Sequence, residues 1–216
     1  MFRDRADAGR QLAAALQSKA LPDPVVLALP RGGVPVAAEV ARQLNAPLDL
    51  LLVRKIGAPH QPELAVAAVA EGGALAINED VLAATGTTHG DVESRARLEV
   101  REIERRRMLY MKGRPPVPVA GRSAIVIDDG IATGATMRAA LRLLRERRPA
   151  RIVLAIPVAP ADTLALMRPL VDDLVCLHTP RYFHAVGAHY VRFDQVEDAE
   201  VIDLMKPLSP PEPHRH

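Results

Sequence analysis

The chain has 216 residues, of which 49% are hydrophobic and 25% charged, a balance typical of a globular protein and not of a disordered or fibrous one. Lys and Arg total 28 against 26 Asp and Glu, so the formal net charge is only +2, and a nucleic-acid-binding protein is not indicated. The single cysteine, Cys176, excludes an internal disulfide framework. Because neither a signal peptide nor an apolar run of about 18 residues is evident, we expect a cytoplasmic protein with no membrane contact.

Short apolar runs alternate with helical patterns along most of the chain. Strands that lack a polar face indicate a mostly parallel sheet covered by helices on both sides, which is a doubly wound α/β fold. In such sheets ligands bind beyond the carboxyl ends of the strands, so the function is expected there. The predicted strands are Val25–Leu29, Leu48–Val53, Ala124–Ile127, Ile152–Val158 and Leu174–Leu177.

The pattern changes in an insertion that covers about residues 57–113. Its first residues, Gly57–Leu64, are polar and contain two prolines, so a loop is expected that is mobile without ligand and closes in a complex. Two apolar runs, Ala65–Ala70 and Ala74–Asn78, flank a Gly-Gly pair and predict a β-hairpin.

A long, strongly charged helix is predicted over Asp91–Lys112. Its arginine-rich stretch, Arg101–Arg107, could contact a phosphate or a nucleic acid, but a solvated helix face is the simpler interpretation. At the C-terminus, residues 207–216 are rich in proline and histidine and predict a disordered tail. Residues 1–206 are therefore expected to form one domain.

The segment Ala124–Thr136, AIVIDDGIATGAT, carries the chemistry. An apolar strand ends in two carboxylates, and a short loop rich in threonine and glycine then opens a helix. The unpaired N–H groups and the dipole at such a helix start favour an anion. The hydroxyls of Thr133 and Thr136 add donors, and Gly134 lets the backbone approach a phosphate closely.

The two acids of this segment, Asp128 and Asp129, cannot hold a phosphate because like charges repel. They suit hydroxyl groups or Mg²⁺ about one sugar length away. A phosphate at one end and a diol at the other describe a ribose 5-phosphate. A strand-to-helix turn with a side-chain cap and no ligand is the structural alternative.

Four stretches resemble the type I phosphoribosyltransferases. VIDDGIATGATMRAAL, Val126–Leu141, looks like the family's motif for phosphoribosyl pyrophosphate (PRPP). PRGGVPVA, Pro30–Ala37, is similar to its pyrophosphate loop, whose peptide is often cis. VRKIGAP, Val53–Pro59, resembles the strand end and flexible loop that close over PRPP. YFHAVGAHY, Tyr182–Tyr190, resembles part of the small C-terminal hood, here about residues 179–194.

The resemblance implies a role for each matching residue. The catalytic set is Asp128 and Asp129, which bind the ribose hydroxyls directly or through Mg²⁺, together with Arg54 and Lys55, which neutralise the leaving pyrophosphate. Phe183 is the candidate for stacking on the base, with ordinary packing as the alternative. The 5-phosphate is expected at Ala132, Thr133, Gly134, Ala135 and Thr136, and the pyrophosphate at Arg31, Gly32 and Gly33.

The implied activity is transfer of ribose 5-phosphate from PRPP to a nucleobase or other nitrogenous acceptor, with Mg²⁺ as cofactor and release of pyrophosphate, in a homodimer. The alternative is a PRPP-sensing regulatory protein with the same fold and little turnover. Two departures from the family pattern bear on the acceptor. Ala132 replaces an acid, and Leu154–Ala159 lacks the lysine that the 6-oxopurine enzymes carry there, so hypoxanthine and guanine are disfavoured.

Overall fold

The computed structural model describes residues 1–59 and 61–206, apart from the side chains of residues 62 and 63. The predicted tail at 207–216 lies outside the described residues. The helices are α1 (Arg5–Gln17), α2 (Gly33–Leu44), α3 (Glu79–Thr85), α4 (His89–Met111), α5 (Ala135–Glu146), α6 (Ala161–Met167) and α7 (Asp198–Leu204). The strands are β1 (Pro24–Ala28), β2 (Leu48–Leu50), β3 (Val53–Ala58), β4 (Gln61–Ala70), β5 (Leu75–Ile77), β6 (Ser123–Ile127), β7 (Arg151–Val158) and β8 (Asp173–His178).

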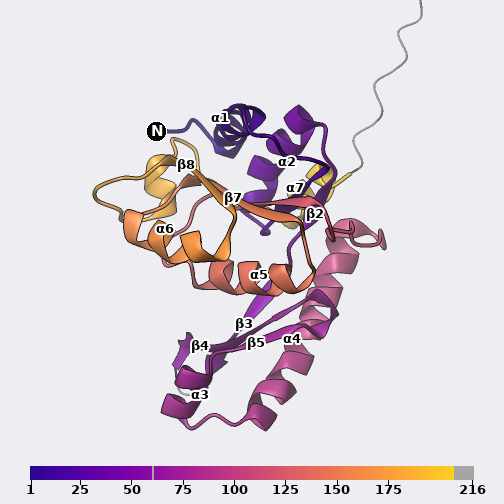
Figure 1. Cartoon of the computed structure of the whole chain (residues 1–216), viewed down its shortest axis with the longest axis vertical. Helices are drawn as coiled ribbons and strands as arrows, with labels where there is room; N and C mark the ends of the chain where they lie inside the picture. The colour runs from indigo at the N-terminus through magenta and orange to yellow at the C-terminus, as the bar shows by residue number, and fades with distance from the viewer. Residues whose placement is uncertain (60, 207–216) are drawn as a thin grey trace, which may run out of the picture.

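A parallel sheet forms the centre of the molecule, with strand order β2-β1-β6-β7-β8. Helices α1 and α2 cover one face and α5 and α6 cover the other (Figure 1). Successive residues of β1 point to opposite faces: Val26 and Ala28 join the core under α1 and α2, whereas Val25 and Leu27 join the core under α5. The strands therefore have no polar face, and the predicted doubly wound α/β fold is confirmed.

The second predicted strand, Leu48–Val53, is wrong as one element. The strand β2 ends at Leu50, and Val53 begins β3 in a different sheet. Leu51 and Leu52 connect the two and are both buried, on opposite sides of the chain. The apolar run therefore continues through the crossing, and the sequence shows no break where the sheets separate.

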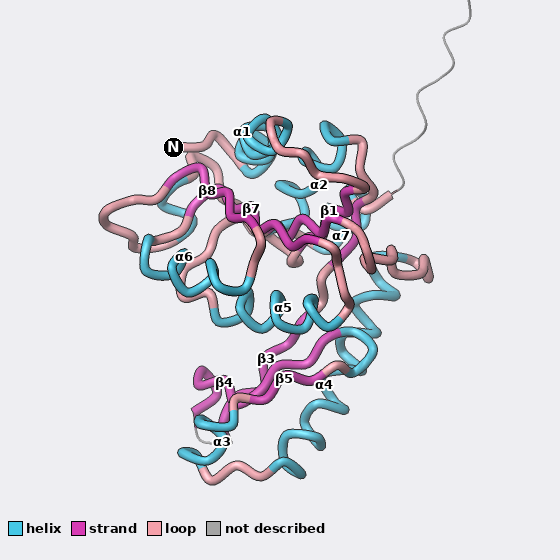
Figure 2. Tube along the Cα trace, viewed as in Figure 1, coloured by secondary structure: helices cyan, strands magenta, loops and turns pink. Residues whose placement is uncertain are grey.

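A small antiparallel sheet, β3-β4-β5, lies below α5 in Figures 1 and 2, beside α3 and α4. The predicted hairpin is confirmed, because β4 pairs with β5 across a turn in which Gly72 and Gly73 have φ of 82° and 83°. The predicted loop Gly57–Leu64 is wrong in part, since β3 and β4 extend into it and pair as far as Ala58 with Gln61. Backbone pairing needs no apolar side chain, so the polar composition concealed these strand ends. Mobility of this region stays a prediction.

Helix α4 joins the small sheet to the main one. Thr88 and Asp91 form a capping box at its start, so the helix begins at His89, slightly before the predicted Asp91. Near its end Arg107 is buried and donates to both carboxylate oxygens of Asp49 in β2, at 2.6 and 3.2 Å. The expectation of a fully solvated arginine face is therefore wrong at Arg107. No helix in the described ranges is both long and apolar enough to cross a membrane.

Candidate functional site

The loops that follow β1 and β6 meet at the carboxyl edge of the main sheet. A Cβ on Gly32 would lie 2.1 Å from Oδ2 of Asp129, and one on Gly33 would lie 2.9 Å from the Cα of Asp128. Real Cβ atoms do not approach other atoms so closely, so only glycine fits at both positions. The Pro30–Arg31 peptide in this loop is cis. The predicted pyrophosphate loop and the two predicted ribose-binding acids are thus in direct contact.

The loop between β6 and α5 is held by hydrogen bonds with β7 and α6. The N–H of Ile131 donates to the carbonyl of Val158 at 3.0 Å, and the buried Thr163 hydroxyl donates to the carbonyl of Ala132 at 2.6 Å. Gly134 has φ of 72°, and a Cβ there would lie 2.3 Å from Cε of Met167. Within the described part of the chain, the N–H groups of residues 132–137 donate to no protein acceptor. They remain available for an anion at the start of α5.

Burial dominates the electrostatics of the acid pair. The pKa of Asp128 is raised well above its ordinary value because the carboxyl is desolvated and lies beside the negative charge of Asp129. The pKa of Asp129 is also raised by burial, although the guanidinium of Arg5 opposes this shift. Arg5 Nε lies 2.8 Å from Asp129 Oδ2. The pair is therefore an acidic centre with one internal counter-charge.

Two residues at this centre were not found from the sequence. Arg5 at the start of α1 and Tyr190 after β8 lie 124 and 61 positions from Asp129. The Tyr190 hydroxyl donates to the main-chain carbonyl of Asp129 at 2.5 Å, and burial raises the tyrosine pKa. Phe2 forms an isolated parallel bridge with Tyr190, which brings the N-terminal and C-terminal segments together beside the acids. Tyr190 ends the stretch that resembles the hood, but its bond to Asp129 was not predicted, and no local pattern signals the contact of Arg5.

The predicted cations Arg54 and Lys55 are neighbours on β3 and therefore point to opposite faces of the small sheet. Arg54 faces α4 and pairs with Glu99 at 2.6 Å. Lys55 faces α5 and lines a hollow of about 240 Å³ together with Ala135 and Arg138. Arg54 also lines a smaller hollow of about 40 Å³ with Pro30 and Thr136. Both cations thus border the predicted phosphate sites, from different sides.

Arg31, the third predicted cation, has a partner in the C-terminal helix. Its Nη1 atom lies 3.5 Å from Oδ1 of Asp198 in α7. The same carboxylate oxygen accepts the Tyr110 hydroxyl at 2.6 Å, and burial together with this bond raises the pKa of Tyr110 to about 12. Arg31 is only partly exposed, so Asp198 competes with any anion that the arginine would bind.

Comparison with known proteins decides the family. The phosphoribosyl transferase domain family matches residues 3–179. The chain belongs to this family. A protein of Mycobacterium tuberculosis, provisionally named a phosphoribosyl transferase, is 47% identical over 208 residues, which are 95% of this chain and 46% of that protein. The chain thus spans about half the length of the curated relatives it matches.

Two solved structures are similar to this phosphoribosyl transferase domain. The crystal structure of TT1426 from Thermus thermophilus has a TM-score of 0.85 and 42% identity, and the match covers 94% of this chain and 97% of that one. The AQ2163 protein of Aquifex aeolicus has a TM-score of 0.51 and 11% identity, with 93% and 84% covered, and shows the fold alone. The first match confirms the expected phosphoribosyltransferase-like core.

The hood of this phosphoribosyl transferase domain packs against the PRPP motif. A Cβ on Gly130 would lie 2.5 Å from Cγ1 of Val186, which begins the short 3₁₀ turn η3 (Val186–His189). Phe183 lies parallel to His189, with ring centroids 5.6 Å apart. It also packs against the small core around Phe2. One side of the Phe183 ring is therefore occupied, and its role in base stacking stays a prediction.

The acid pair of this domain does not by itself form a metal site. Among the described residues no group of three or more His, Cys, Asp or Glu side chains could hold an ion, and Arg5 already occupies Oδ2 of Asp129. Mg²⁺ in proteins prefers several oxygen ligands and keeps part of its water. The donor set fits an ion that arrives with the phosphates of a substrate, with Asp128 and Asp129 as its carboxylate neighbours.

Proposed function

We propose that the chain transfers ribose 5-phosphate from Mg²⁺-bound PRPP to a nitrogenous acceptor and releases pyrophosphate. The supporting observation is the contact between the glycine loop, Pro30–Gly33, and the acid pair, Asp128 and Asp129, beside a row of free N–H groups at the start of α5. The start of α5, the acid pair and the glycine loop then offer an anion site, a diol site and a second anion site. PRPP carries its 5-phosphate, its ribose hydroxyls and its pyrophosphate in the same order. Family membership makes PRPP the expected donor.

Each part of the site has one task in this reaction. The loop of residues 132–136 holds the 5-phosphate, and Asp128 and Asp129 accept hydrogen bonds from the ribose hydroxyls. The acceptor nitrogen forms a bond to C1 while the C1–O bond breaks and its electron pair leaves with pyrophosphate. Arg31, Arg54, Lys55 and the N–H of Gly32 stabilise that leaving charge, which is an electrostatic form of catalysis. When bound, Mg²⁺ supplies further positive charge at the pyrophosphate.

The acceptor is expected not to be a 6-oxopurine. The end of β7, Leu154–Val158, is fully apolar and buried, so it offers no donor to an exocyclic oxygen. A buried carbonyl without a partner costs roughly 1–3 kcal/mol, or about ten- to a hundredfold in discrimination. Ala132 also lacks the carboxylate that could stabilise a proton on a purine ring. Hypoxanthine and guanine should therefore be poor substrates.

A PRPP sensor with little turnover is the second candidate. Two of the three predicted cations, Arg31 and Arg54, already have carboxylate partners in Asp198 and Glu99. A ligand must compete with these partners, which favours regulated binding over rapid turnover. The sensor would bind Mg²⁺-PRPP and form no product with any acceptor.

A pyrophosphate-release screen separates the two candidates. The protein would be incubated with Mg²⁺ and PRPP against a panel of nucleobases and amines, with Asp128→Asn as the inactive control. Acceptor-dependent release by the natural protein alone supports the transferase. PRPP binding without release for any acceptor supports the sensor, and absence of PRPP binding rejects both. Sedimentation of the same preparation tests the proposed homodimer.

A further inference from the structure

An arginine from the N-terminal helix lies inside the acidic centre. Arg5 Nε and Asp129 Oδ2 are 2.8 Å apart, and the two side chains are only 12% and 14% exposed. Ion pairs on the surface contribute little because water screens them, but a pair this far from water interacts strongly. Arg5 therefore acts directly on Asp129, one of the two acids that the proposed function assigns to binding the ribose hydroxyls.

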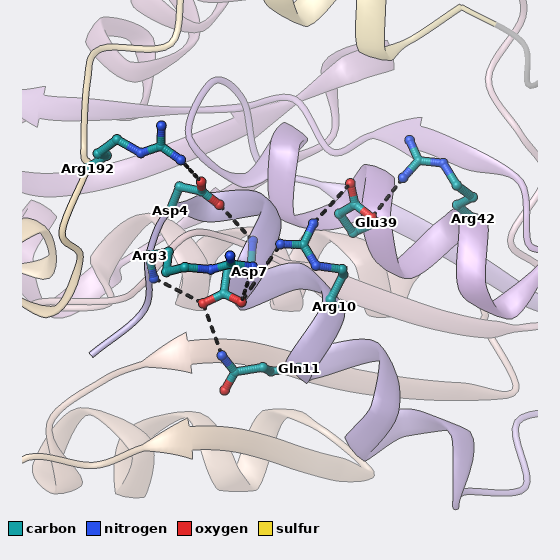
Figure 3. Close-up of polar contacts among 8 residues, drawn as sticks. All are labelled: Arg3, Asp4, Asp7, Arg10, Gln11, Glu39, Arg42 and Arg192. Carbon is teal, nitrogen blue, oxygen red and sulfur yellow. Dashed lines mark hydrogen bonds and ion pairs between the residues drawn. The ribbon is translucent and has the colours of Figure 1, made fainter.

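Arg5 cannot easily swing away from this position. Its guanidinium carbon lies 3.8 Å from the centre of the Phe193 ring, and its Nη1 donates to the carbonyl of Asp194 at 2.7 Å. The turn that carries it is itself fixed, as Figure 3 shows: Asp4 pairs with Arg192 and accepts the N–H of Asp7. The C-terminal segment therefore clamps the start of α1 and Arg5 from two sides.

Asp129 is also held by several polar contacts, and only its Oδ1 atom has no donor among the described residues. Its Oδ2 faces Arg5, its carbonyl accepts the Tyr190 hydroxyl, and its N–H donates to Oδ1 of Asp128 at 2.9 Å. This Oδ1 atom is left as an acceptor for a ligand. The ion pair at Oδ2 fixes the orientation of the carboxylate, and with it the directions from which a hydroxyl can donate to Oδ1.

Charge gives the second reason for this arrangement. PRPP carries several negative charges, and an uncompensated carboxylate at Asp129 would repel it strongly in a poorly hydrated site. Arg5 offsets the negative charge of Asp129 with a cation that belongs to the chain. Asp129 can then accept a hydroxyl without a divalent cation bound to it.

We infer that Arg5 is a positioning residue for ribose recognition: it fixes and neutralises Asp129 so that Oδ1 accepts one hydroxyl of the sugar. This inference rests on the proposed function, because it assumes that the acids contact the ribose. It assigns a binding role to the N-terminal helix, whose contribution the family motifs do not indicate.

The test compares ribose 5-phosphate with its 2-deoxy and 3-deoxy analogues, which have the same charge and each lack one of the two hydroxyls that the acid pair would bind. Their dissociation constants would be measured by calorimetry for the natural protein and for Arg5→Ala and Arg5→Lys. A hydrogen bond to a charged acceptor gives the natural protein a preference of about tenfold or more for ribose. The preference should fall below about threefold in Arg5→Ala and recover in part in Arg5→Lys, which keeps the charge but not the planar group that stacks on Phe193.

Arg10→Ala is the matched control, because Arg10 lies on the same helix and pairs with Asp7 and Glu39, and its removal leaves the contacts of Arg5 and Asp129 in place. It should keep the natural preference. If Arg5→Ala does not fold, Phe193→Leu removes the ring beneath the guanidinium and should lower the preference by itself.

A general loss of stability or of positive charge weakens the binding of every ligand equally and leaves the ratios of their dissociation constants unchanged. Binding of Mg²⁺-PRPP by the natural protein without any preference for ribose overturns the inference, as does a natural preference in Arg5→Ala. Failure of the natural protein to bind PRPP at all would instead reject the proposed function.

Discussion

Two ion pairs in this molecule look alike and differ in one respect. Asp49 and Arg107 join the main sheet to α4, while Asp129 and Arg5 lie at the candidate site; each pair has a carboxylate and an arginine withdrawn from water. Asp49 accepts four hydrogen bonds, two from Arg107 and one each from the N–H groups of Leu50 and Val117. In contrast, Oδ1 of Asp129 has no donor among the described residues.

The difference shows how to separate a structural ion pair from a functional one. A buried carboxylate whose lone pairs are all used has nothing left to offer a ligand, so Asp49 can only stabilise or specify the fold. Asp129 keeps unused acceptor capacity at Oδ1, beside the glycine loop Pro30–Gly33. Unused hydrogen-bonding capacity, rather than burial or charge, marks the site.

The largest effect is expected from breaking the structural pair. Arg107→Ala leaves the Asp49 carboxylate buried and unpaired, which should lower the free energy of unfolding by about 3–5 kcal/mol. Urea denaturation would measure the loss. Arg105→Ala is the control: Arg105 lies on the same helix but pairs with Glu102 on the surface, so its removal should leave the free energy of unfolding nearly unchanged. Equal losses for both variants would contradict the comparison.

The next effect concerns the phosphate loop. Gly134→Ala should cost roughly 1–2 kcal/mol of stability for a left-handed residue, and it should weaken PRPP binding at least about tenfold because the new methyl group displaces the loop from Met167. Gly121→Ala is closely matched, since Gly121 also has φ of 72° but a Cβ there meets nothing within 4 Å. Gly121→Ala should lose a similar amount of free energy of unfolding and should bind PRPP with unchanged affinity. Unchanged affinity in Gly134→Ala would place the phosphate elsewhere.

A third effect follows from the pKa of Asp128. Burial raises this pKa, so the folded state holds a proton that the unfolded state has released, and stability falls as the pH rises through the folded pKa. Asp128→Asn removes this loss. The variant should melt about 2–4 °C above the natural protein at pH 8, with a smaller difference at pH 5. A difference in melting temperature that narrows as the pH rises would contradict a raised pKa for Asp128.

The smallest effect is expected at the half-exposed pair between Arg54 and Glu99, whose side chains are 37% and 29% exposed. Glu99→Gln removes the carboxylate that competes for Arg54. PRPP should then bind about two- to fivefold more tightly, in line with the small energy of a partly solvated pair. Glu102→Gln, on the outer part of the same helix, serves as the control. Weaker binding in Glu99→Gln would show that Glu99 orients Arg54 for the ligand.

Much of the fold was predictable because its signals are local. Strands buried on both faces appear as apolar runs, and the acid pair followed by a threonine- and glycine-rich loop appears in one segment, Ala124–Thr136. The glycine loop at Pro30–Gly33 was predictable for the same reason. Their meeting at one edge follows from the rule that parallel strands end together.

The remaining parts depend on contacts between distant residues. Arg5, Thr163 and Tyr190 hold the site through single side chains on segments far from the motif. The hood-like stretch that ends at Tyr190 was visible in the sequence, but none of these three contacts was. The ends of β3 and β4 form through backbone pairing, which polar residues allow as well as apolar ones. Arg107 was expected in solvent because the sequence shows its charge but does not show that Asp49 lies beside it in the fold.

Calorimetric titration with Mg²⁺-PRPP tests the central claim most directly. The natural protein should bind at millimolar ligand or below, and replacing both acids, Asp128→Asn with Asp129→Asn, should weaken binding at least about a hundredfold by weakening the hydrogen bonds that both acids accept from the ribose. Circular dichroism would verify that the double variant is folded. No heat of binding from the natural protein, or equal affinity in the double variant, would contradict the assignment of this sheet edge as a PRPP site.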